Sequence, residues 1–263
     1  MDKSKIHIYL LIVLVSFVTI SFKNVDGYKY KAYKIPASKI RLTSFYVNDF
    51  DQVLAPIGGG IYLIKEKNWF LPPSKDYYFT SFATNLSDSS FFVFGNTPDA
   101  SKLYYIKIEE KQPIQRYALA ELDLGKYNII YKSNIGYVWG VGKKKSKIGM
   151  VTDKGIKWIF EIEGVINQVQ VNDKSEVFFS MGNTIYNIAK QKKVLALASK
   201  IYGFDFNDEG KLVVSYNEGI GIKDGDYIDI VATGAEGLVQ FKNKKIYVLP
   251  QNGQFLYEFY QSI

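Results

Sequence analysis

Apolar residues recur at every second position in short segments along most of the chain, and Gly, Asn, Asp and Pro separate these segments. Side chains that alternate with a period of two lie on opposite faces of a β-strand, whereas an amphipathic helix needs a period of 3.6. Beyond residue 27 no long stretch follows the helical period. The pattern therefore predicts an all-β protein.

Three of these stretches share one order of elements: a strand, an Asn-Asp turn, a second strand, a turn with Gly or Asn, and a third strand. They cover residues 44–64, 168–188 and 203–222, and each continues through a charged turn into a fourth apolar strand. Weaker copies cover residues 81–96, 136–162 and 238–259. The first turns are anchored at positions 48, 85, 140, 172, 207 and 242, mostly about 35 residues apart. This is the size of a four-stranded propeller blade.

We therefore expect a single domain over residues 28–263, folded as a β-propeller of six blades. The long interval after position 85 indicates an insertion around residues 98–126, and the short one after 140 indicates a trimmed blade. The last repeat ends after three strands, and "YKYKAYKIP" at 28–36 can supply its fourth and close the ring. A β-sandwich or an open barrel is the alternative, although neither requires a repeated unit.

The first 27 residues have the pattern of a secretory signal peptide. Lys3 and Lys5 precede an apolar run over residues 8–22, and the small Gly27 suits a cleavage site. This segment predicts a secreted, extracellular protein that has no membrane attachment after cleavage. A retained signal anchor is the alternative, because the apolar run is nearly long enough to span a bilayer.

The composition excludes several kinds of chemistry. The chain has no Cys, and its one histidine, His7, lies in the signal segment. A Ser-His-Asp triad, a thiol nucleophile, a His/Cys zinc site and a structural disulfide are therefore excluded from the mature chain. The carboxylate pairs, such as Asp224 and Asp226, fall in turns or on exposed strand faces. We expect no catalytic residues, no metal, no cofactor and no enzymatic activity.

Positive charge does not predict a nucleic-acid partner. The formal net charge is +7, but most lysines are scattered along the chain. The only dense run is "KKKSK" at residues 143–147, and such a run is typical of a solvated hairpin tip. A tripeptide at Asn85–Ser87 matches the N-glycosylation sequon, so Asn85 is a candidate for modification in a secreted protein.

The stretch at residues 205–210, "DFNDEG", begins like a calcium-binding loop. Asp205, Asn207 and Gly210 fit the first, third and sixth positions of such a loop, but Tyr216 occupies the twelfth, where a bidentate Glu is needed. The same corner recurs at Asn48 and Asn172. Because Asn and Asp side chains bond the nearby backbone in turns, we interpret the motif as a blade corner.

The candidate ligand site lies where the innermost strands begin, by analogy with other propellers. Polar and aromatic residues at these positions form a largely neutral, hydrogen-bonding set that suits a planar, polar organic ligand. The alternative is that they order water in the channel. The candidates are Arg41, Ser44, Tyr78, Ser81, Tyr137, Trp139, Gln168, Tyr202, Asp205 and Gln240.

The phrases "VFFSMGNTIYNI", "IYGFDFNDEGKLVVSYNEGI" and "KIYVLPQNGQFLYEF" carry a resemblance to a known family. With the signal segment and the chain length, they resemble the insect ommochrome-binding proteins, small secreted propeller-like proteins of haemolymph. More distantly they are similar to NHL and regulator-type propeller repeats. The resemblance covers most of residues 40–260 and implies a carrier or scavenger of tryptophan-derived pigments.

Three functions follow from these observations. The first is a secreted, non-enzymatic carrier of an aromatic small molecule such as an ommochrome. The second is an extracellular scaffold for protein interactions, which would use the insertion at 98–126 and the "KKKSK" tip. The third is a metal-dependent hydrolase or lactonase that uses carboxylates in the channel.

Overall fold

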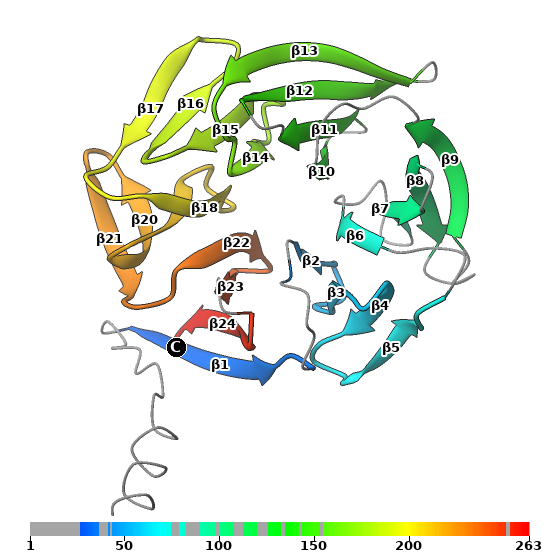
Figure 1. Ribbon diagram of the computed structural model, residues 1–263. Helices are drawn as coiled ribbons and strands as arrows, with labels where there is room; N and C mark the ends of the chain where they lie inside the picture. The colour runs from blue at the N-terminus through cyan, green and yellow to red at the C-terminus, as the bar shows by residue number, and fades with distance from the viewer. Residues whose placement is uncertain are drawn as a thin grey trace, which may run out of the picture.

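The computed structural model describes residues 27–36, 42, 44–74, 79–82, 90–97, 100–107, 113–119, 126–132, 135–141, 144–152, 155–250 and 253–262. Within these ranges the regular elements are β-strands, which pair into six four-stranded sheets. The sheets stand around a common centre (Figure 1). The all-β propeller predicted from the sequence is confirmed. The predicted signal segment lies outside the described residues, except for Gly27.

Five of the six sheets are built from four consecutive antiparallel strands. The first contains β2 (Tyr46–Val47), β3 (Val53–Ile57), β4 (Gly60–Leu63) and β5 (Asn68–Leu71). The second contains β6 (Phe79–Phe82), β7 (Ser90–Thr97), β8 (Ala100–Lys107) and β9 (Pro113–Leu119). The third contains β10 (Lys126–Lys132), β11 (Ile135–Val141), β12 (Lys145–Thr152) and β13 (Gly155–Glu163).

The fourth sheet contains β14 (Gln168–Val171), β15 (Val177–Met181), β16 (Thr184–Asn187) and β17 (Lys192–Ala196). The fifth contains β18 (Ile201–Phe206), β19 (Leu212–Tyr216), β20 (Gly219–Asp224) and β21 (Tyr227–Ala232). In each of the five, the first strand lies nearest the centre and the fourth lies at the rim (Figure 1).

The sixth sheet joins the two ends of the described chain. It contains β22 (Gly237–Lys242), β23 (Lys245–Pro250) and β24 (Phe255–Gln261), and its rim strand is β1 (Tyr28–Lys34). Tyr28 pairs with Gln261, and the register continues without a shift to Lys34 opposite Phe255. The segment at 28–36 thus supplies the fourth strand of the last repeat, as the sequence predicted.

A β-bulge in the rim strand distinguishes the other five sheets from the sixth. The pairing of the third and fourth strands skips one rim residue in each of them: Phe70, Arg116, Ile159, Val194 and Val231. A bulge breaks the alternation of side chains and lets neighbouring residues face the same side. The bulge is therefore part of the repeated unit, although the alternating pattern of the sequence does not reveal it.

The hydrophobic core lies between the faces of adjacent sheets. One cluster joins Phe178 and Ile185 of the fourth sheet to Phe204 and Val214 of the fifth. Another packs Tyr247, Leu249 and Leu256 of the sixth sheet against residues of the first, such as Val53. Strands β3 and β19 are buried at every position, so both of their faces are covered and they are apolar at more positions than a one-sided sheet would need.

The Asn-containing turns have the structural role that the repeat predicted. The side-chain Oδ1 of Asn207 accepts hydrogen bonds from the backbone N–H groups of Glu209 and Lys211, at 3.1 and 2.8 Å. Asn172 and Asn48 make the equivalent bonds to Glu176 and Gln52. The residue three positions after each Asn has a positive φ: 63° at Asp51, 60° at Ser175 and 74° at Gly210. These three corners share one backbone conformation.

Three expectations about the repeat are wrong. Residues 98–126 are not an insertion, because they contain β8, β9 and the start of β10. The sheet after them is complete with four strands and is not trimmed. Position 140 lies inside β11 and does not anchor a first turn. The turn that follows β10 lacks the Asn-Asp pair that marks the first turn in other repeats. The repeat pattern therefore predicted β11, and not β10, as the innermost strand of this sheet.

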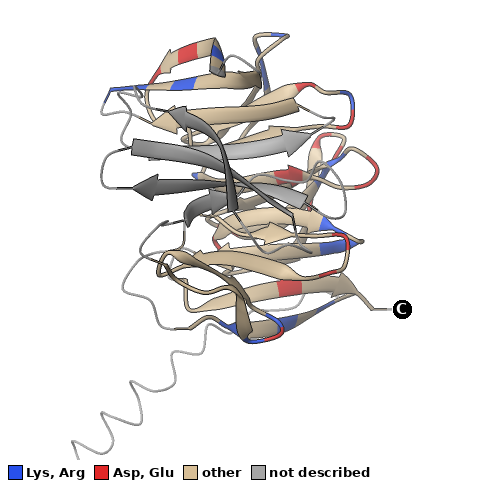
Figure 2. Ribbon diagram, turned by 90° about the vertical axis from the view of Figure 1, so that its right-hand side faces the viewer, with Lys and Arg blue, Asp and Glu red and all other residues tan. Residues whose placement is uncertain are grey.

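Many charged residues lie in turns at the right-hand edge of the side view (Figure 2).

Within the part of the chain that the structure describes, no helix has the length and hydrophobicity needed to cross a membrane.

Candidate functional site

The predicted channel residues fall into three groups. Arg41 and Tyr78 lie outside the described residues, as does the glycosylation candidate Asn85. Ser81 lies in β6, opposite Phe94 of β7. Ser44 is half-buried just before β2. The remaining six are described with their side chains.

Tyr137 and Trp139 are not on the innermost strand. They lie on β11, the second strand of their sheet, and both are buried. They pack in the core between the third and fourth sheets with Val169 and Phe179. The Nε1 of Trp139 is buried and has no hydrogen-bond partner within the described part of the protein. The prediction that they lie at the channel entrance is therefore wrong. The error follows from the misplaced repeat anchor at position 140.

Gln168 on β14 links three inner strands. Its Oε1 accepts a hydrogen bond from the backbone N–H of Phe204 on β18 at 2.9 Å, and its Nε2 donates to the carbonyl of Val239 on β22 at 3.4 Å. The strands can approach this closely because residue 203 is Gly. A Cβ there would lie 2.7 Å from the carbonyl oxygen of Gly237 and 2.9 Å from the Gln168 Oε1.

Asp205 and Gln240 continue this pattern around the ring. The Oδ2 of Asp205 on β18 accepts a hydrogen bond from the backbone N–H of Phe241 on β22 at 2.8 Å. The side chain of Gln240 bonds the backbone of β2 and the residue before it, Val47 N–H at 3.0 Å and Phe45 C=O at 2.6 Å. These three side chains hold inner strands together, and ligand binding by them stays a prediction.

Tyr202 is half-buried near the beginning of β18. Its hydroxyl donates a hydrogen bond to Oδ1 of Asn217 at 2.7 Å. Burial and the nearby Glu236 carboxylate raise the pKa of this hydroxyl. Tyr202 therefore stays neutral and serves as a hydrogen-bond donor.

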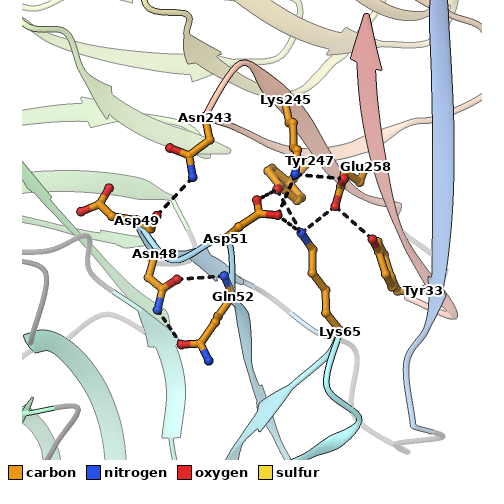
Figure 3. A network of polar contacts seen from close by, with 10 residues as sticks. All are labelled: Tyr33, Asn48, Asp49, Asp51, Gln52, Lys65, Asn243, Lys245, Tyr247 and Glu258. Atoms are coloured by element: carbon orange, nitrogen blue, oxygen red, sulfur yellow. Dashed lines mark hydrogen bonds and ion pairs between the residues drawn. The ribbon is translucent and has the colours of Figure 1, made fainter. Parts of the chain in front are cut away.

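A cluster of charged side chains joins the first and sixth sheets, and sequence reasoning did not find it. We call it the junction cluster; it consists of Tyr33, Asp51, Lys65, Lys245, Tyr247 and Glu258 (Figure 3). Lys65 Nζ lies 2.6 Å from Glu258 Oε2 and 2.8 Å from Asp51 Oδ2. Lys245 Nζ lies 2.6 Å from the same Asp51 oxygen and 3.3 Å from Glu258 Oε1.

The turn geometry places Asp51 in the junction cluster. Its φ of 63° is unusual for a residue with a Cβ, and its carboxylate accepts hydrogen bonds from Lys65, Lys245 and Tyr247. Burial alone would raise the pKa of Asp51, but these bonds and the charge of Lys65 outweigh it and lower the pKa to about 2. Asp51 is therefore ionised at every physiological pH.

The tyrosines of the junction cluster complete its charge balance. Burial, with hydrogen bonds to the carboxylates, raises the pKa of Tyr247 and of Tyr33 well above the ordinary value. Both phenols are therefore neutral, and two lysines face two carboxylates. Glu258 is only 2% exposed, so its charge must be matched inside the protein. Since the groups satisfy one another, the junction cluster has the character of a structural link between the sheets.

A groove of about 440 Å³ lies between the fourth and fifth sheets, and we call it the lysine groove. Apolar side chains form part of its lining: Phe178, Val194, Phe206 and Leu212. The rings of Phe178 and Phe206 are in contact, with centroids 4.9 Å apart and planes inclined at 58°. The remaining lining residues are Asn172, Asn187, Lys190, Lys192, Lys193, Gly210, Lys211 and Lys223.

The bulge in β17 explains why consecutive residues line the groove. Tyr186 pairs with Lys193 and Ile185 with Leu195, so Val194 is the extra residue. The break in alternation lets Lys192, Lys193 and Val194 all contribute to the lining. Val194 remains 36% exposed. The sequence places "KQKK" in a charged turn, but only the packed sheets turn it toward an apolar concavity.

The described residues that line the groove include five lysines and no acidic residue. Two of these lysines have carboxylate partners outside the lining. Lys190 lies 2.6 Å from Glu176, and Lys211 lies 2.7 Å from Asp224 and 3.1 Å from Glu209. Hydrogen bonds with Asp224 and Glu209 raise the pKa of Lys211. Lys223 donates to the carbonyl of Gly225.

Lys192 and Lys193 are exposed and have no ion pair with any described residue.

Within the described ranges, no group of three or more potential His, Asp or Glu ligands lies close enough together to hold a metal ion.

Comparisons with solved structures support the fold. The chain is similar to a catalytically inactive virginiamycin B lyase from Staphylococcus aureus crystallised with quinupristin, with a TM-score of 0.58, 16% identity, and coverage of 90% of this chain and 100% of the other. A protein assigned as a gluconolactonase matches with a TM-score of 0.63, 9% identity, and coverage of 92% and 98%. An aldose sugar dehydrogenase from Streptomyces coelicolor matches with a TM-score of 0.58, 11% identity, and coverage of 91% and 100%. No protein-family model and no curated protein sequence matches the chain.

These likenesses correct one expectation. The sequence predicted a protein without enzymatic activity, but the same fold, over nine tenths of this chain, is that of a lyase and a sugar dehydrogenase. This likeness of fold overturns the prediction of a protein without enzymatic activity, and the missing His and Cys restrict only which chemistry is open to residues beyond 27. Identities of 9–16% establish the fold alone, and they assign neither a reaction nor a substrate to this chain.

Proposed function

We propose that this protein is secreted and binds a small aromatic molecule in the lysine groove. In this proposal the six four-stranded sheets are the blades of one ring, closed by β1. The resemblance to ommochrome-binding proteins makes a tryptophan-derived pigment the first ligand to test.

The lysine groove is the observation that supports this function. Its volume of about 440 Å³ lies within the range of small-molecule sites, roughly 300–1,000 Å³. Phe178 and Phe206 offer ring surfaces, against which a flat aromatic molecule packs favourably. By contrast, Gln168, Asp205 and Gln240 in the channel already use their polar groups to bond neighbouring strands.

Filling the groove tests the proposal. The fluorescent probe 8-anilinonaphthalene-1-sulfonate is expected to bind with a dissociation constant on the order of tens of micromolar. Val194→Tyr places a ring in the groove from an exposed position, so the protein should fold while binding weakens at least tenfold.

Val165→Tyr is the matched control, because Val165 is 51% exposed and does not line the groove. It should bind the probe like the wild type. Competition by an ommochrome pigment such as xanthommatin then tests the ligand class. Equal binding by the wild type and the Val194→Tyr variant would show that the groove is not the site.

A further inference from the structure

Positive charge at the lysine groove exceeds the negative charge available to balance it. Five lysines are among the described residues that line it, and of these only Lys190 and Lys211 have carboxylate partners within the described ranges. Like charges that surround a concave, low-dielectric surface focus the electrostatic potential and raise the local concentration of anions. The unbalanced lysines of the described lining therefore leave a positive potential that attracts anions.

Apolar and cationic groups share the same concavity. Val194 lies next to Lys193 in the bulged strand. Phe206 precedes Gly210 by four residues in the sequence, and both line the groove together with Lys211. A ligand seated on the apolar side chains would therefore have ammonium groups at its edge. Burying an aromatic ring provides most of the affinity. The ammonium groups of the lysines then favour rings that carry an anionic substituent.

We infer that the lysine groove selects aromatic anions, in which a flat apolar ring carries a carboxylate, sulfonate or phosphate held at Lys192 and Lys193. This inference rests on the proposed binding function and names its ligand class. Neutral aromatic molecules would bind more weakly, because they gain no ion pair with the ammonium groups. Inorganic anions would bind weakly as well, since they bury no apolar area.

A pair of probes with the same rings tests the selection. 8-Anilinonaphthalene-1-sulfonate is anionic, and N-phenyl-1-naphthylamine lacks its sulfonate. In the wild type, the anionic probe is expected to bind about tenfold more tightly, since its sulfonate forms exposed ion pairs with Lys192 and Lys193. Raising NaCl from 0.05 to 0.5 M should reduce this preference, because salt screens exposed charges. Sodium sulfate at equal ionic strength should compete no better than NaCl.

The double variant Lys192→Gln and Lys193→Gln should lower the preference for the anionic probe to less than about threefold. Lys29→Gln with Lys34→Gln is the matched control, because it removes two exposed charges from β1, far from the groove, and should keep the tenfold preference. Circular dichroism spectra and melting temperatures of both double variants confirm that they fold.

Each result has a defined meaning. If both probes bind the wild type equally and Val194→Tyr weakens both, the groove binds aromatic rings but the inference about anions is wrong. If the anionic preference survives in the Lys192→Gln and Lys193→Gln variant, these lysines do not select the ligand, and the inference is also wrong. If Val194→Tyr weakens neither probe, the proposed function itself fails.

Discussion

The junction cluster and the lysine groove both gather lysines between two adjacent sheets, yet their charges are arranged in opposite ways. In the junction cluster, Lys65 and Lys245 face two carboxylates, one of which is almost fully buried. In the groove, Lys192 and Lys193 are exposed and have no carboxylate partner among the described residues. The comparison shows that lysine content alone does not reveal the role of a site.

Energetics account for this difference. A charge removed from water must be matched, because its desolvation costs several kcal/mol. An exposed charge keeps its hydration and can remain unpaired at little cost. The junction cluster can therefore hold sheets together, whereas the groove can keep its positive charge for a partner.

The largest effect is expected at Glu258. Glu258→Gln keeps the shape of the side chain but leaves Lys65, only 14% exposed, and Lys245 to share the single carboxylate of Asp51. The free energy of unfolding should fall by about 3 kcal/mol, as when one partner of a buried pair is removed. Urea denaturation at pH 7 measures this change.

A matched control and a second variant complete this prediction. Glu66→Gln, at an exposed residue beside Lys65, should leave stability unchanged. Adding Lys65→Met to Glu258→Gln should cost less than the sum of the two single changes, because the double variant removes the unmatched charge. A loss below about 1 kcal/mol for Glu258→Gln would mean that the junction cluster does not link the sheets.

A smaller, pH-dependent effect is expected at Asp51. Its pKa of about 2 in the folded protein lies below the ordinary value of 3.8, so the carboxylate stabilises the fold above about pH 4. That stabilisation is lost as the pH falls through 2. Asp51→Asn should reduce the free energy of unfolding by roughly 1 kcal/mol at pH 7, because the side chain is 35% exposed and solvent screens its charge.

The difference between the wild type and Asp51→Asn should shrink from pH 4 to pH 2. Urea denaturation at several pH values in this window measures it. Asp208→Asn changes an exposed turn residue and should follow the wild-type profile throughout. A difference between the wild type and Asp51→Asn that stays constant down to pH 2 would contradict the role assigned to the ionised carboxylate.

The smallest effect on stability is expected in the lysine groove. Reversing both charges with Lys192→Glu and Lys193→Glu should cause no loss of stability, because neither lysine has an ion pair in the part of the chain that the structure describes and each has like-charged neighbours. Thermal unfolding checks this expectation, and the same variant should no longer bind the anionic probe. A marked drop in the melting temperature would show that these lysines, like those of the junction cluster, support the fold.

The sequence was informative wherever a feature depends on neighbours along the chain. The recurring Asn at positions 48, 172 and 207 predicted turns in which its side chain bonds the backbone, and the structure contains these bonds. The same repeat predicted that residues 28–36 complete the last sheet. It failed at position 140, because the turn after β10 lacks an Asn-Asp signal, and Tyr137 and Trp139 were consequently assigned to the wrong strand.

Neither candidate region could be found in this way. Lys65 and Glu258 are 193 positions apart, and only the packing of the first sheet against the sixth brings them together. The lysine groove depends on a bulge in β17 and on the approach of the fifth sheet. The role of Gln168 as a link between strands likewise depends on β18 and β22 coming close at Gly203.

The sequence by itself determined the all-β fold, the Asn corners at positions 48, 172 and 207, the repeated unit and the absence of thiol and imidazole chemistry beyond residue 27. Alternation and turn preferences are local properties, so they can be read along the chain. The tertiary structure alone decided which of the described lysines are paired with carboxylates and which remain exposed without such a partner. Burial and charge matching are set by residues far apart in sequence, because the cost of an unpaired charge depends on how much water the folded protein removes from it.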